Sequence, residues 1–332
     1  MNVAGLAGMR ALVTGADGFI GSHLVERLVE EGVHVKALCL YNSNGSYGWL
    51  NDYTQNHENK VDFHLGDVRD PGYVQNLADG VDAIFHLAAL ISIPYSYQAP
   101  ASFVATNVQG TLNVLEAARQ AGAVRVINTS TSEVYGTPET TPIREQHPLQ
   151  AQSPYAATKV AADQLCYSYA CSFGVDVVTL RPFNTFGPRQ STRAVIPAIL
   201  TQLLAGRNEV HLGSLTPRRD FTYVSDTVDG FVRMASSQVP AGSVIQLGTG
   251  QAVTIQEIFD KCCEVTGVHA RVTVEESRIR PAKGEVQVLE SDPSRAYRNL
   301  QWKPTMSLID GLKRTADWLE SKQLPYVERY HR

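Results

Sequence analysis

The sequence predicts an α/β fold: a doubly wound parallel sheet with helices on both faces, followed by a smaller, interleaved α/β lobe. Two observations lead to this prediction. Up to residue 182, apolar runs of strand length alternate with amphipathic runs of helix length, which is typical of a parallel sheet covered by helices. Beyond Arg181 the alternation stops, and turn-rich segments separate short strands and helices.

Each element of the first half follows from its apolar pattern. The strand-like runs are 10–15, 34–40, 61–67, 81–89, 124–130 and 175–182. Helical spacing of apolar residues predicts helices over 21–32, 108–122 and 154–174, with Gly32 as the C-cap of the first.

In the second half, we predict a loop over 183–193, a helix over 194–206 and a further sheet strand over 243–250. From there up to the segment 308–322, we expect a mixture of short strands and helices. We therefore expect a first domain over 1–180, to which the strand near 243–248 returns, and a lobe built mainly from 181–332.

Composition excludes several classes of protein. The 332 residues carry a net charge of −4, which argues against nucleic-acid binding, and no apolar run approaches the length of a membrane span. The N-terminus lacks the pattern of a secretion signal, so we expect a cytoplasmic protein. The cysteines show no metal-ligand spacing, so we expect no metal site and reduced, buried thiols at Cys39, Cys166, Cys171, Cys262 and Cys263.

A glycine-rich turn joins the first strand to the first helix. Gly15, Gly18 and Gly21 stand in the segment VTGADGFIG with the spacing G-x-x-G-x-x-G. Glycines at such a turn let the backbone approach a pyrophosphate at the helix N-terminus. The first domain is therefore predicted to be a Rossmann domain that binds NAD(P).

The end of the second strand lacks the usual acidic marker of NAD. Cys39 stands where an acid would hold the adenosine ribose, and no Arg is present there for the extra phosphate of NADP. We favour NAD, with NADP as the alternative, and Asn42 or Ser43 as ribose contacts. Asp67 and Val68, after the third strand, could meet the adenine edge, although Asp67 could equally cap its strand end.

Two further segments carry reactive side chains. Tyr155 and Lys159 are four residues apart, so on a helix they share one face. A neighbouring ammonium stabilises phenolate and makes Tyr a usable base. The segment NTSTSEVYG, residues 128–136, places Thr131, Ser132 and Glu133 in a row after a predicted buried strand.

Six motifs together resemble the extended short-chain dehydrogenase/reductase family of NAD-dependent epimerases and dehydratases. They are TGADGFIGSHL, HLAA, STSEVYG, SPYAATK, RPFNTFGPRQ and RRDFTYVSD, in the family's order over residues 9–320. Within the family, HLAALISIPYSY, STSEVYGT and GPRQSTRAVIP most resemble bacterial nucleotide-sugar 4,6-dehydratases of legionaminic acid pathways.

The resemblance implies a recycled NAD(P) and a reaction on a nucleotide-activated sugar. It makes Tyr155 the base at the carbon 4 hydroxyl, with Lys159 on the nicotinamide ribose and Thr131 bonded to the same hydroxyl. Glu133 would take the proton from carbon 5, water would leave from carbon 6, and hydride would return to carbon 6.

Ser132 keeps three activities open. Well-known dehydratases of this family have Asp here as the acid that protonates the leaving hydroxide, and a Ser hydroxyl is a poor acid. Glu133 could act as base and then acid, or Ser132 could relay through water. Thr-Ser-Glu also resembles UDP-glucuronate decarboxylases, and a 4-epimerase needs neither group. A non-catalytic NAD(P)-binding regulator is the alternative from another class, although Tyr155 and Lys159 argue against it.

The resemblance also assigns binding residues. The cofactor set is Gly15, Asp17, Gly18, Phe19, Ile20, Gly21, Asn42, Ser43, Asp67, Val68, Leu87, Ala88, Ala89, Thr106, Thr129, Tyr155, Lys159 and Pro182. The substrate set, for a nucleotide-diphosphate sugar, is Ser92, Asn184, Val195, Arg219 and Arg280. We expect His86 to pack at its strand end, and helices 101–120 and 154–173 to pair in a homodimer.

Overall fold

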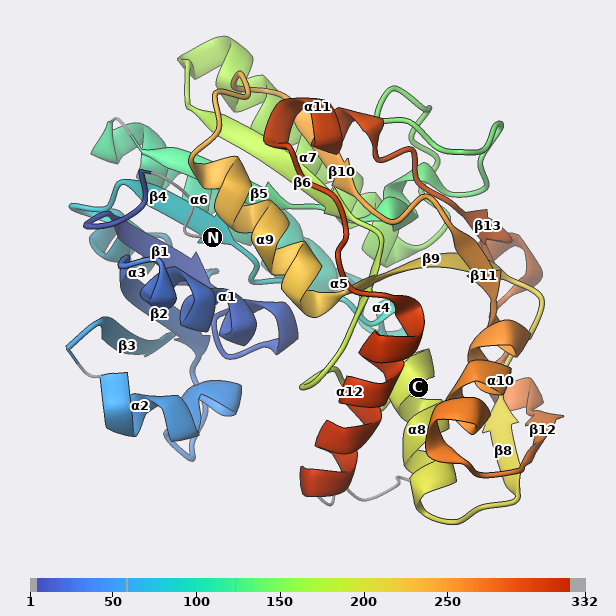
Figure 1. Cartoon of the computed structure of the whole chain (residues 1–332). Coiled ribbons are helices and arrows are strands. Elements are labelled where there is room, and N and C mark those ends of the chain that lie inside the picture. Colours follow the sequence, from blue (N-terminus) through green and yellow to red (C-terminus); the bar gives the residue numbers. More distant parts are fainter. Residues whose placement is uncertain (1–4, 58, 123, 323–332) are drawn as a thin grey trace.

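The computed structural model describes residues 5–57, 59–122 and 124–322, and it confirms the predicted fold class. A seven-stranded sheet has the order β10-β6-β5-β4-β1-β2-β3, and every pair in it is parallel (Figure 1). Its strands are β1 (Arg10–Thr14), β2 (His34–Leu40), β3 (Val61–Gly66), β4 (Ala83–His86), β5 (Arg125–Thr129), β6 (Val177–Pro182) and β10 (Val244–Leu247).

Helices cover both faces of this sheet because successive strand residues point to opposite sides and both sides are apolar. One hydrophobic cluster lies under α1 (Phe19–Glu30) and α9 (Val224–Ala235), in front of the sheet in Figure 1. A second lies under α3 (Pro71–Ala78), α6 (Gly110–Ala121) and α7 (Pro154–Phe173), behind it.

The smaller lobe is built around β9 (Arg218–Tyr223). This strand pairs antiparallel with β11 (Ala252–Thr254) and parallel with β7 (Asn184–Phe186) and β13 (Val288–Leu289). We predicted a loop throughout 183–193, but Asn184–Phe186 forms β7 because it finds a partner in β9. A separate pair joins β8 (Glu209–Leu212) to β12 (Arg271–Val274).

The lobe helices and the connecting segments complete the chain. The lobe contains α8 (Val195–Leu204), α10 (Ile255–Thr266), α11 (Ser294–Leu300) and α12 (Leu308–Lys322). The connections after β2 and β4 contain η1 (Gly48–Leu50), α2 (Asn51–His57), α4 (Ile93–Gln98), α5 (Pro100–Phe103) and the wide helical turn η2 (Val104–Gln109). Short turns are η3 (Ser132–Tyr135), η4 (Glu276–Arg278) and η5 (Ala282–Gly284).

The segment after β2 contacts the last helix of the lobe. The rings of Trp49 in η1 and Trp318 in α12 meet edge to face, with 5.3 Å between ring centroids. Gly48, with φ +58°, lies against the glycine turn, since a Cβ there would be 2.7 Å from the carbonyl oxygen of Asp17. The C-terminal helix and the glycine turn are therefore joined through this segment.

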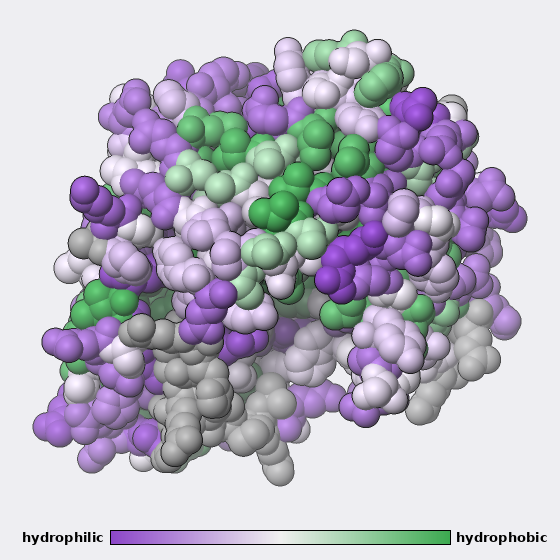
Figure 2. Space-filling view, turned by 180° about the vertical axis from the view of Figure 1, so that it is seen from behind, coloured by the Kyte–Doolittle hydropathy of each residue, from purple (hydrophilic) through white to green (hydrophobic). Residues whose placement is uncertain are grey.

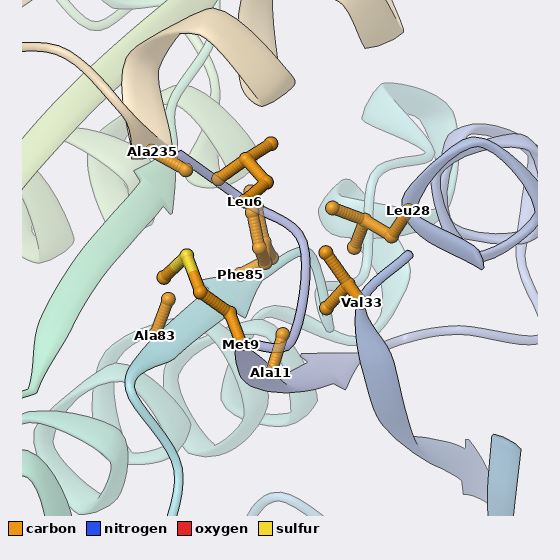
Figure 3. Close-up of a pocket in the computed structure, with 8 residues that line it drawn as sticks. All are labelled: Leu6, Met9, Ala11, Leu28, Val33, Ala83, Phe85 and Ala235. Atoms are coloured by element: carbon orange, nitrogen blue, oxygen red, sulfur yellow. The ribbon is translucent and has the colours of Figure 1, made fainter. Parts of the chain in front are cut away.

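The amino end of the sheet is filled by apolar side chains. The pocket in Figure 3 lies where β1 and β4 begin and is lined by Leu6, Met9, Ala11, Leu28, Val33, Ala83, Phe85 and Ala235. It is at the opposite edge of the sheet from the strand ends that carry the predicted site, and it holds no polar side chain.

Two further expectations can be compared with the structure. Cys39, Cys166 and Cys262 are buried and Cys263 is partly buried, but Cys171 is exposed, so the prediction of five buried thiols was wrong at this position. Cys171 lies on an outward face of α7, which the apolar pattern of the sequence did not distinguish. Within the described part of the chain, no helix combines the length and the apolar character that a membrane span requires.

Candidate active site

The candidate site lies at the carboxyl edge of the parallel sheet, where ligands bind in open α/β sheets. β1, β4 and β5 end side by side at Thr14, His86 and Thr129. The glycine turn follows β1, and the catalytic candidates Thr131, Ser132 and Glu133 follow β5. The order of strands thus brings together segments more than a hundred residues apart.

The glycine turn packs closely against its neighbours at the start of α1. Gly15 has φ +70° and lies against the backbone of Ala88, 2.7 Å from the position of an added Cβ. Gly21 packs on the carbonyl oxygen of Gly15, 2.1 Å from such a Cβ. Gly18 is the N-cap of α1, and no side chain caps the helix, so its first N–H groups can bind an anion.

The residues flanking this turn are partly covered. Asp17, Phe19 and Ile20 are each half-buried. Burial raises the pKa of the Asp17 carboxyl, and backbone hydrogen bonds partly offset that rise.

The segment after β2 is held by Asn42. Its side-chain amide donates to the carbonyl oxygens of Leu40 at 3.0 Å and Ser46 at 2.7 Å, and its Oδ1 accepts from the N–H of Ser46 at 3.0 Å. The amide that we predicted as a ribose contact is therefore engaged inside its own loop. Ser43 is exposed.

After β3, the two predicted adenine contacts differ in exposure. Asp67 forms an ion pair with Arg69, and this hydrogen-bonded guanidinium lowers the pKa of its carboxyl. Val68 is 5% exposed and packs on Gly110 at the start of α6, so its side chain belongs to the hydrophobic core. Sequence reasoning missed Arg69, although its place two residues after Asp67 allows such a pair.

The end of β4 is fixed by a buried chain of hydrogen bonds. His86 Nδ1 lies 2.9 Å from Thr14 Oγ1, and its Nε2 lies 3.0 Å from Thr111 Oγ1. Burial, with a smaller effect of Lys159, lowers the pKa of His86 to about 3, so the ring is neutral. His86 is 2% exposed and thus packs at the strand end, as the sequence indicated.

The segment after His86 is tied to two helices by Asn107, which sequence reasoning missed. The Asn107 amide bonds both backbone groups of Leu90, at 2.8 and 2.9 Å, and donates to Thr158 Oγ1 at 3.0 Å. Leu87, Ala88, Ala89 and Thr106 are half-buried around this segment. The sequence signal that could have identified Asn107 was a single amide residue within an apolar helical pattern.

Ser92, which was predicted to bind substrate, caps α4. Its side chain accepts a hydrogen bond from the N–H of Tyr95 at 3.4 Å.

The three residues in the row after β5 differ in burial. Thr131 caps η3, and its Oγ1 accepts from the N–H of Glu133 at 3.2 Å. Ser132 is only 3% exposed, whereas Thr131 and Glu133 are partly exposed. The Thr131 hydroxyl also lowers the pKa of the Tyr155 phenol and thereby favours its ionised form.

Helix α7 brings Tyr155 and Lys159 to the same edge. Pro154 and the cap Ser153 start the helix, with Ser153 Oγ accepting from the N–H of Ala156 at 3.1 Å. Burial raises the pKa of Tyr155; the Thr131 hydroxyl opposes this rise and the Glu133 charge adds to it.

Lys159 reaches back to β5. Its Nζ donates to the carbonyl oxygen of Thr129 at 2.5 Å. Burial lowers the pKa of Lys159, and the carboxylate of Asp163 opposes that change.

These groups fit a dinucleotide. The buried Oγ1 of Thr129 has no hydrogen-bond partner within the described residues, next to the carbonyl that Lys159 binds. The glycine turn provides the close backbone approach, and Pro182 ends β6 along the same edge. An orphaned hydroxyl, a buried ammonium and an uncapped helix N-terminus are the donors that ribose and pyrophosphate require.

The lobe supplies cations opposite this edge. Arg219 on β9 is 5% exposed and donates to Glu285 Oε1 at 2.9 Å, and Arg280 lies 3.5 Å from the same oxygen. Burial lowers the pKa of Arg219, while the charges of Glu133 and Glu285 oppose this effect. Glu133 and Arg219 are thus close enough to interact across the site.

Two other predicted substrate residues lie on neighbouring elements. Asn184 begins β7, and its buried Oδ1 has no hydrogen-bond partner within the described part of the chain. Val195 is the first residue of α8, whose N-cap Ala194 makes no side-chain capping bond. Glu285 was missed by sequence reasoning; an acid five residues after Arg280 in RPAKGE was its only signal.

Comparison with known proteins places the chain in a family. The family model described as GDP-mannose 4,6 dehydratase matches residues 12–315. UDP-glucose 4-epimerase of Mycolicibacterium smegmatis is 35% identical over 320 residues, 95% of this chain and 99% of that protein. UDP-glucuronic acid decarboxylase 1 of Xenopus tropicalis is 33% identical, covering 94% of this chain and 72% of that protein.

A solved structure extends the comparison to the fold. The dTDP-glucose 4,6-dehydratase of Streptomyces venezuelae, crystallised with NAD, superposes with a TM-score of 0.83 at 32% identity. The match covers 95% of this chain and 98% of that one. The relatives thus include epimerases, decarboxylases and dehydratases at similar identity. The chain belongs to the GDP-mannose 4,6-dehydratase family, among the NAD-dependent epimerases and dehydratases of the extended short-chain dehydrogenase/reductases.

Proposed function

We propose that this enzyme is an NAD-dependent nucleotide-sugar 4,6-dehydratase. The observation that carries the proposal is the position of Glu133. Its carboxylate is partly exposed and lies close enough to both Tyr155 and Arg219 to act on the pKa of each. A 4-epimerase needs one base at carbon 4, whereas 4,6-dehydration needs a second base for carbon 5.

In the proposed dehydration, each candidate residue of the site has its own role. Tyr155 takes the proton of the carbon 4 hydroxyl, and Thr131, which lowers the pKa of the phenol, orients that hydroxyl. The ammonium of Lys159, four residues further along the same helix, is proposed to stabilise the phenolate. NAD, when bound, would supply the hydride acceptor for carbon 4 and the hydride donor for carbon 6. The carbonyl formed at carbon 4 acidifies the proton at carbon 5, which Glu133 removes. Glu133 then gives this proton to the hydroxide that leaves carbon 6, so that water departs. As hydride reaches carbon 6, carbon 5 takes up the proton that Tyr155 removed from the carbon 4 hydroxyl, and both residues regain their starting protonation state.

Ser132 has no direct role in this scheme. It is 3% exposed, and its hydroxyl is far less acidic than a carboxylic acid. Glu133 therefore acts as base and then as acid.

The burial of Ser132 also supports a second candidate. A 4-epimerase or a UDP-glucuronate decarboxylase oxidises carbon 4 but needs no acid for a leaving hydroxide. Both activities occur among the relatives.

The substrate is a nucleotide diphosphate sugar, and we propose an N-acetylhexosamine, as in legionaminic acid pathways. Arg219 and Arg280 provide guanidinium groups for the diphosphate, which they can bind in bidentate geometry. Asn184 offers an unpaired buried oxygen, and Val195 places the start of α8 beside the nucleotide. Among cofactors we favour NAD over NADP, and we place the enzyme in the cytoplasm.

The test is incubation of the purified protein with UDP- and GDP-N-acetylglucosamine, dTDP-glucose and UDP-glucuronate, followed by product mass. Loss of one water from one substrate is the expected result. Loss of carbon dioxide or an isomer of unchanged mass would refute the dehydratase in favour of the second candidate.

Two variants sharpen this test. Glu133→Gln should still oxidise carbon 4 but form no dehydrated product, because only the second base is lost. Tyr155→Phe should stop oxidation itself. A protein whose biological function survived Tyr155→Phe would be a regulator rather than an enzyme.

We also propose a homodimer through the helical segments 101–120 and 154–173, which lie behind the central sheet in Figure 1. Figure 2 shows this side of the molecule, where hydrophobic residues form patches that are surrounded by polar residues. Val104, Tyr167 and Phe173, on η2 and α7, are each more than half exposed. Sedimentation of the wild type against Tyr167→Glu tests this, and an unchanged mass in the variant would contradict it.

A further inference from the structure

Asp163 shares one face of α7 with the two residues assigned to proton transfer. It follows Lys159 by four residues and Tyr155 by eight, so the three side chains lie along one stripe of the helix. Asp163 is 4% exposed, and the proposed reaction does not use it. A buried carboxylate at this place requires a reason, because burying a charge is costly unless it is paired.

The carboxylate of Asp163 holds the end of β5. Ser130 Oγ donates to its Oδ2 at 2.7 Å, and Asn128 Nδ2 donates to its Oδ1 at 3.4 Å. These two residues flank Thr129, whose carbonyl oxygen accepts from Lys159 Nζ. Asp163 thus fixes the strand end that receives the lysine and belongs to the same helix as the lysine.

An arginine pairs with this carboxylate. Arg181 on β6 donates through Nε to Asp163 Oδ2 at 3.0 Å, and its Nη2 lies 2.9 Å from the same oxygen. Arg181 Nη1 donates to the hydroxyl of Tyr135 at 3.1 Å, and that hydroxyl donates to Gln246 on β10 at 3.1 Å. The ion pair is therefore connected to three strands of the central sheet, β5, β6 and β10, and to the turn η3 that follows β5.

The charged and titratable groups around Lys159 come from three elements. Asp163 and Cys166 face it from α7, and burial keeps the Cys166 thiol protonated by raising its pKa. His86 on β4 is neutral, and Arg181 on β6 is paired with Asp163. Asp163 is thus the carboxylate that acts on Lys159 against the effect of burial.

We propose that Asp163 is a positioning residue that keeps Lys159 protonated and directed at Thr129, with Arg181 holding the carboxylate of Asp163 in place. The proposal rests on the function proposed above, in which the charge of Lys159 stabilises the phenolate of Tyr155. It assigns the buried ion pair to catalysis rather than to stability alone.

The test compares two variants that break the same ion pair. Asp163→Asn removes the negative charge next to Lys159, whereas Arg181→Gln leaves that charge in place. The full-length protein with NAD is labelled at the ε-carbons of lysine, and the resonance of Lys159 is identified by its loss in Lys159→Arg. Its titration is then followed by NMR as the pH is raised.

Asp163→Asn should move the titration midpoint of Lys159 to lower pH by about one unit or more, because an opposite charge is lost. Arg181→Gln should leave the midpoint at or above the wild-type value. The alkaline limb of the kcat–pH profile should move with the midpoint in each variant. An unchanged midpoint in Asp163→Asn, or the same shift in both variants, would overturn the proposal.

Two further results distinguish a failure of this proposal from a folding failure and from a failure of the proposed function. If Asp163→Asn does not fold, the double variant Asp163→Asn/Arg181→Gln replaces the ion pair by neutral amides, and it should lower the midpoint as well. If no sugar nucleotide is turned over, the function proposed above fails, whereas the NMR titration still decides the role of Asp163.

Discussion

Replacing Gly21 by alanine should force α1 away from the glycine turn. The new Cβ would lie 2.1 Å from the carbonyl oxygen of Gly15, 2.9 Å from its carbonyl carbon and 3.0 Å from Ala16 Cα. All three are backbone atoms, which cannot turn aside as a flexible side chain can. Ordinary contacts are about 3.5 Å or longer, so the helix start must move by more than about 1 Å.

The size of the effect follows from this displacement. Overpacking of a close contact costs about 1–3 kcal/mol of unfolding free energy. Loss of one hydrogen bond from the helix N-terminus to a charged phosphate removes about 1.5–3 kcal/mol of binding free energy. The dissociation constant of NAD should therefore rise about 10- to 100-fold.

Urea unfolding and calorimetric titration with NAD measure the two effects. Gly18→Ala is the matched control for folding, because its nearest neighbour, Gly15 O, would be 3.3 Å from the added Cβ and φ at Gly18 is −77°. Gly18→Ala should unfold near the wild-type urea concentration. A Gly21→Ala protein with wild-type stability and wild-type affinity for NAD would refute the reasoning.

Three further predictions concern single side chains. Tyr155→Phe should lower kcat about 10²- to 10⁴-fold in steady-state assays, with NAD still bound, because it removes one general base. The folded-state pKa of His86 is about 3, below its unfolded value of 6.5, so unfolding takes up a proton as the pH falls below 6.5. Its contribution to stability is complete above pH 6.5 and falls by about 2 kcal/mol between pH 6.5 and 5, which urea unfolding of His86→Asn should not show. Trp318→Ala removes the ring contact with Trp49, worth about 0.5–1.5 kcal/mol, and should weaken NAD binding roughly 2- to 10-fold in calorimetry.

Each of these has a result that would count against it. Full turnover in Tyr155→Phe would mean that another group takes the proton from the substrate. An acid-induced loss of stability in His86→Asn equal to that of the wild type would assign the pH dependence to other groups. Trp318→Ala is compared with Tyr297→Ala on α11, whose ring is 62% exposed, and equal NAD affinity of the two variants would contradict the coupling.

The fold and the shared helix position of Tyr155 and Lys159 could be predicted because they depend on local patterns. Buried parallel strands appear as short apolar runs, and four-residue spacing places Tyr155 and Lys159 on one helix face whatever surrounds them. The glycine turn is also local, since its three glycines lie within seven residues.

Side-chain partners were harder to predict, because a polar residue in a loop has several neighbours to choose from. Asn42 bonds its own loop, Asp67 pairs with Arg69, and Ser92 caps a helix. The ion pair between Asp163 and Arg181 joins a helix to the following strand, and its support from Tyr135 and Gln246 spans 111 residues. Such contacts depend on tertiary packing, which no local spacing encodes.

The position of β10 at the sheet edge has a consequence for how the chain can fold and be divided. β10 pairs with β6 although more than sixty residues of lobe separate them along the chain. A fragment that stopped after β6 would leave unpaired those backbone N–H and C=O groups of β6 that face β10, as a template for association with other chains. The complete sheet therefore cannot be obtained by ending the chain after β6, and during synthesis it is complete only after β7, α8, β8 and β9 of the lobe have been made.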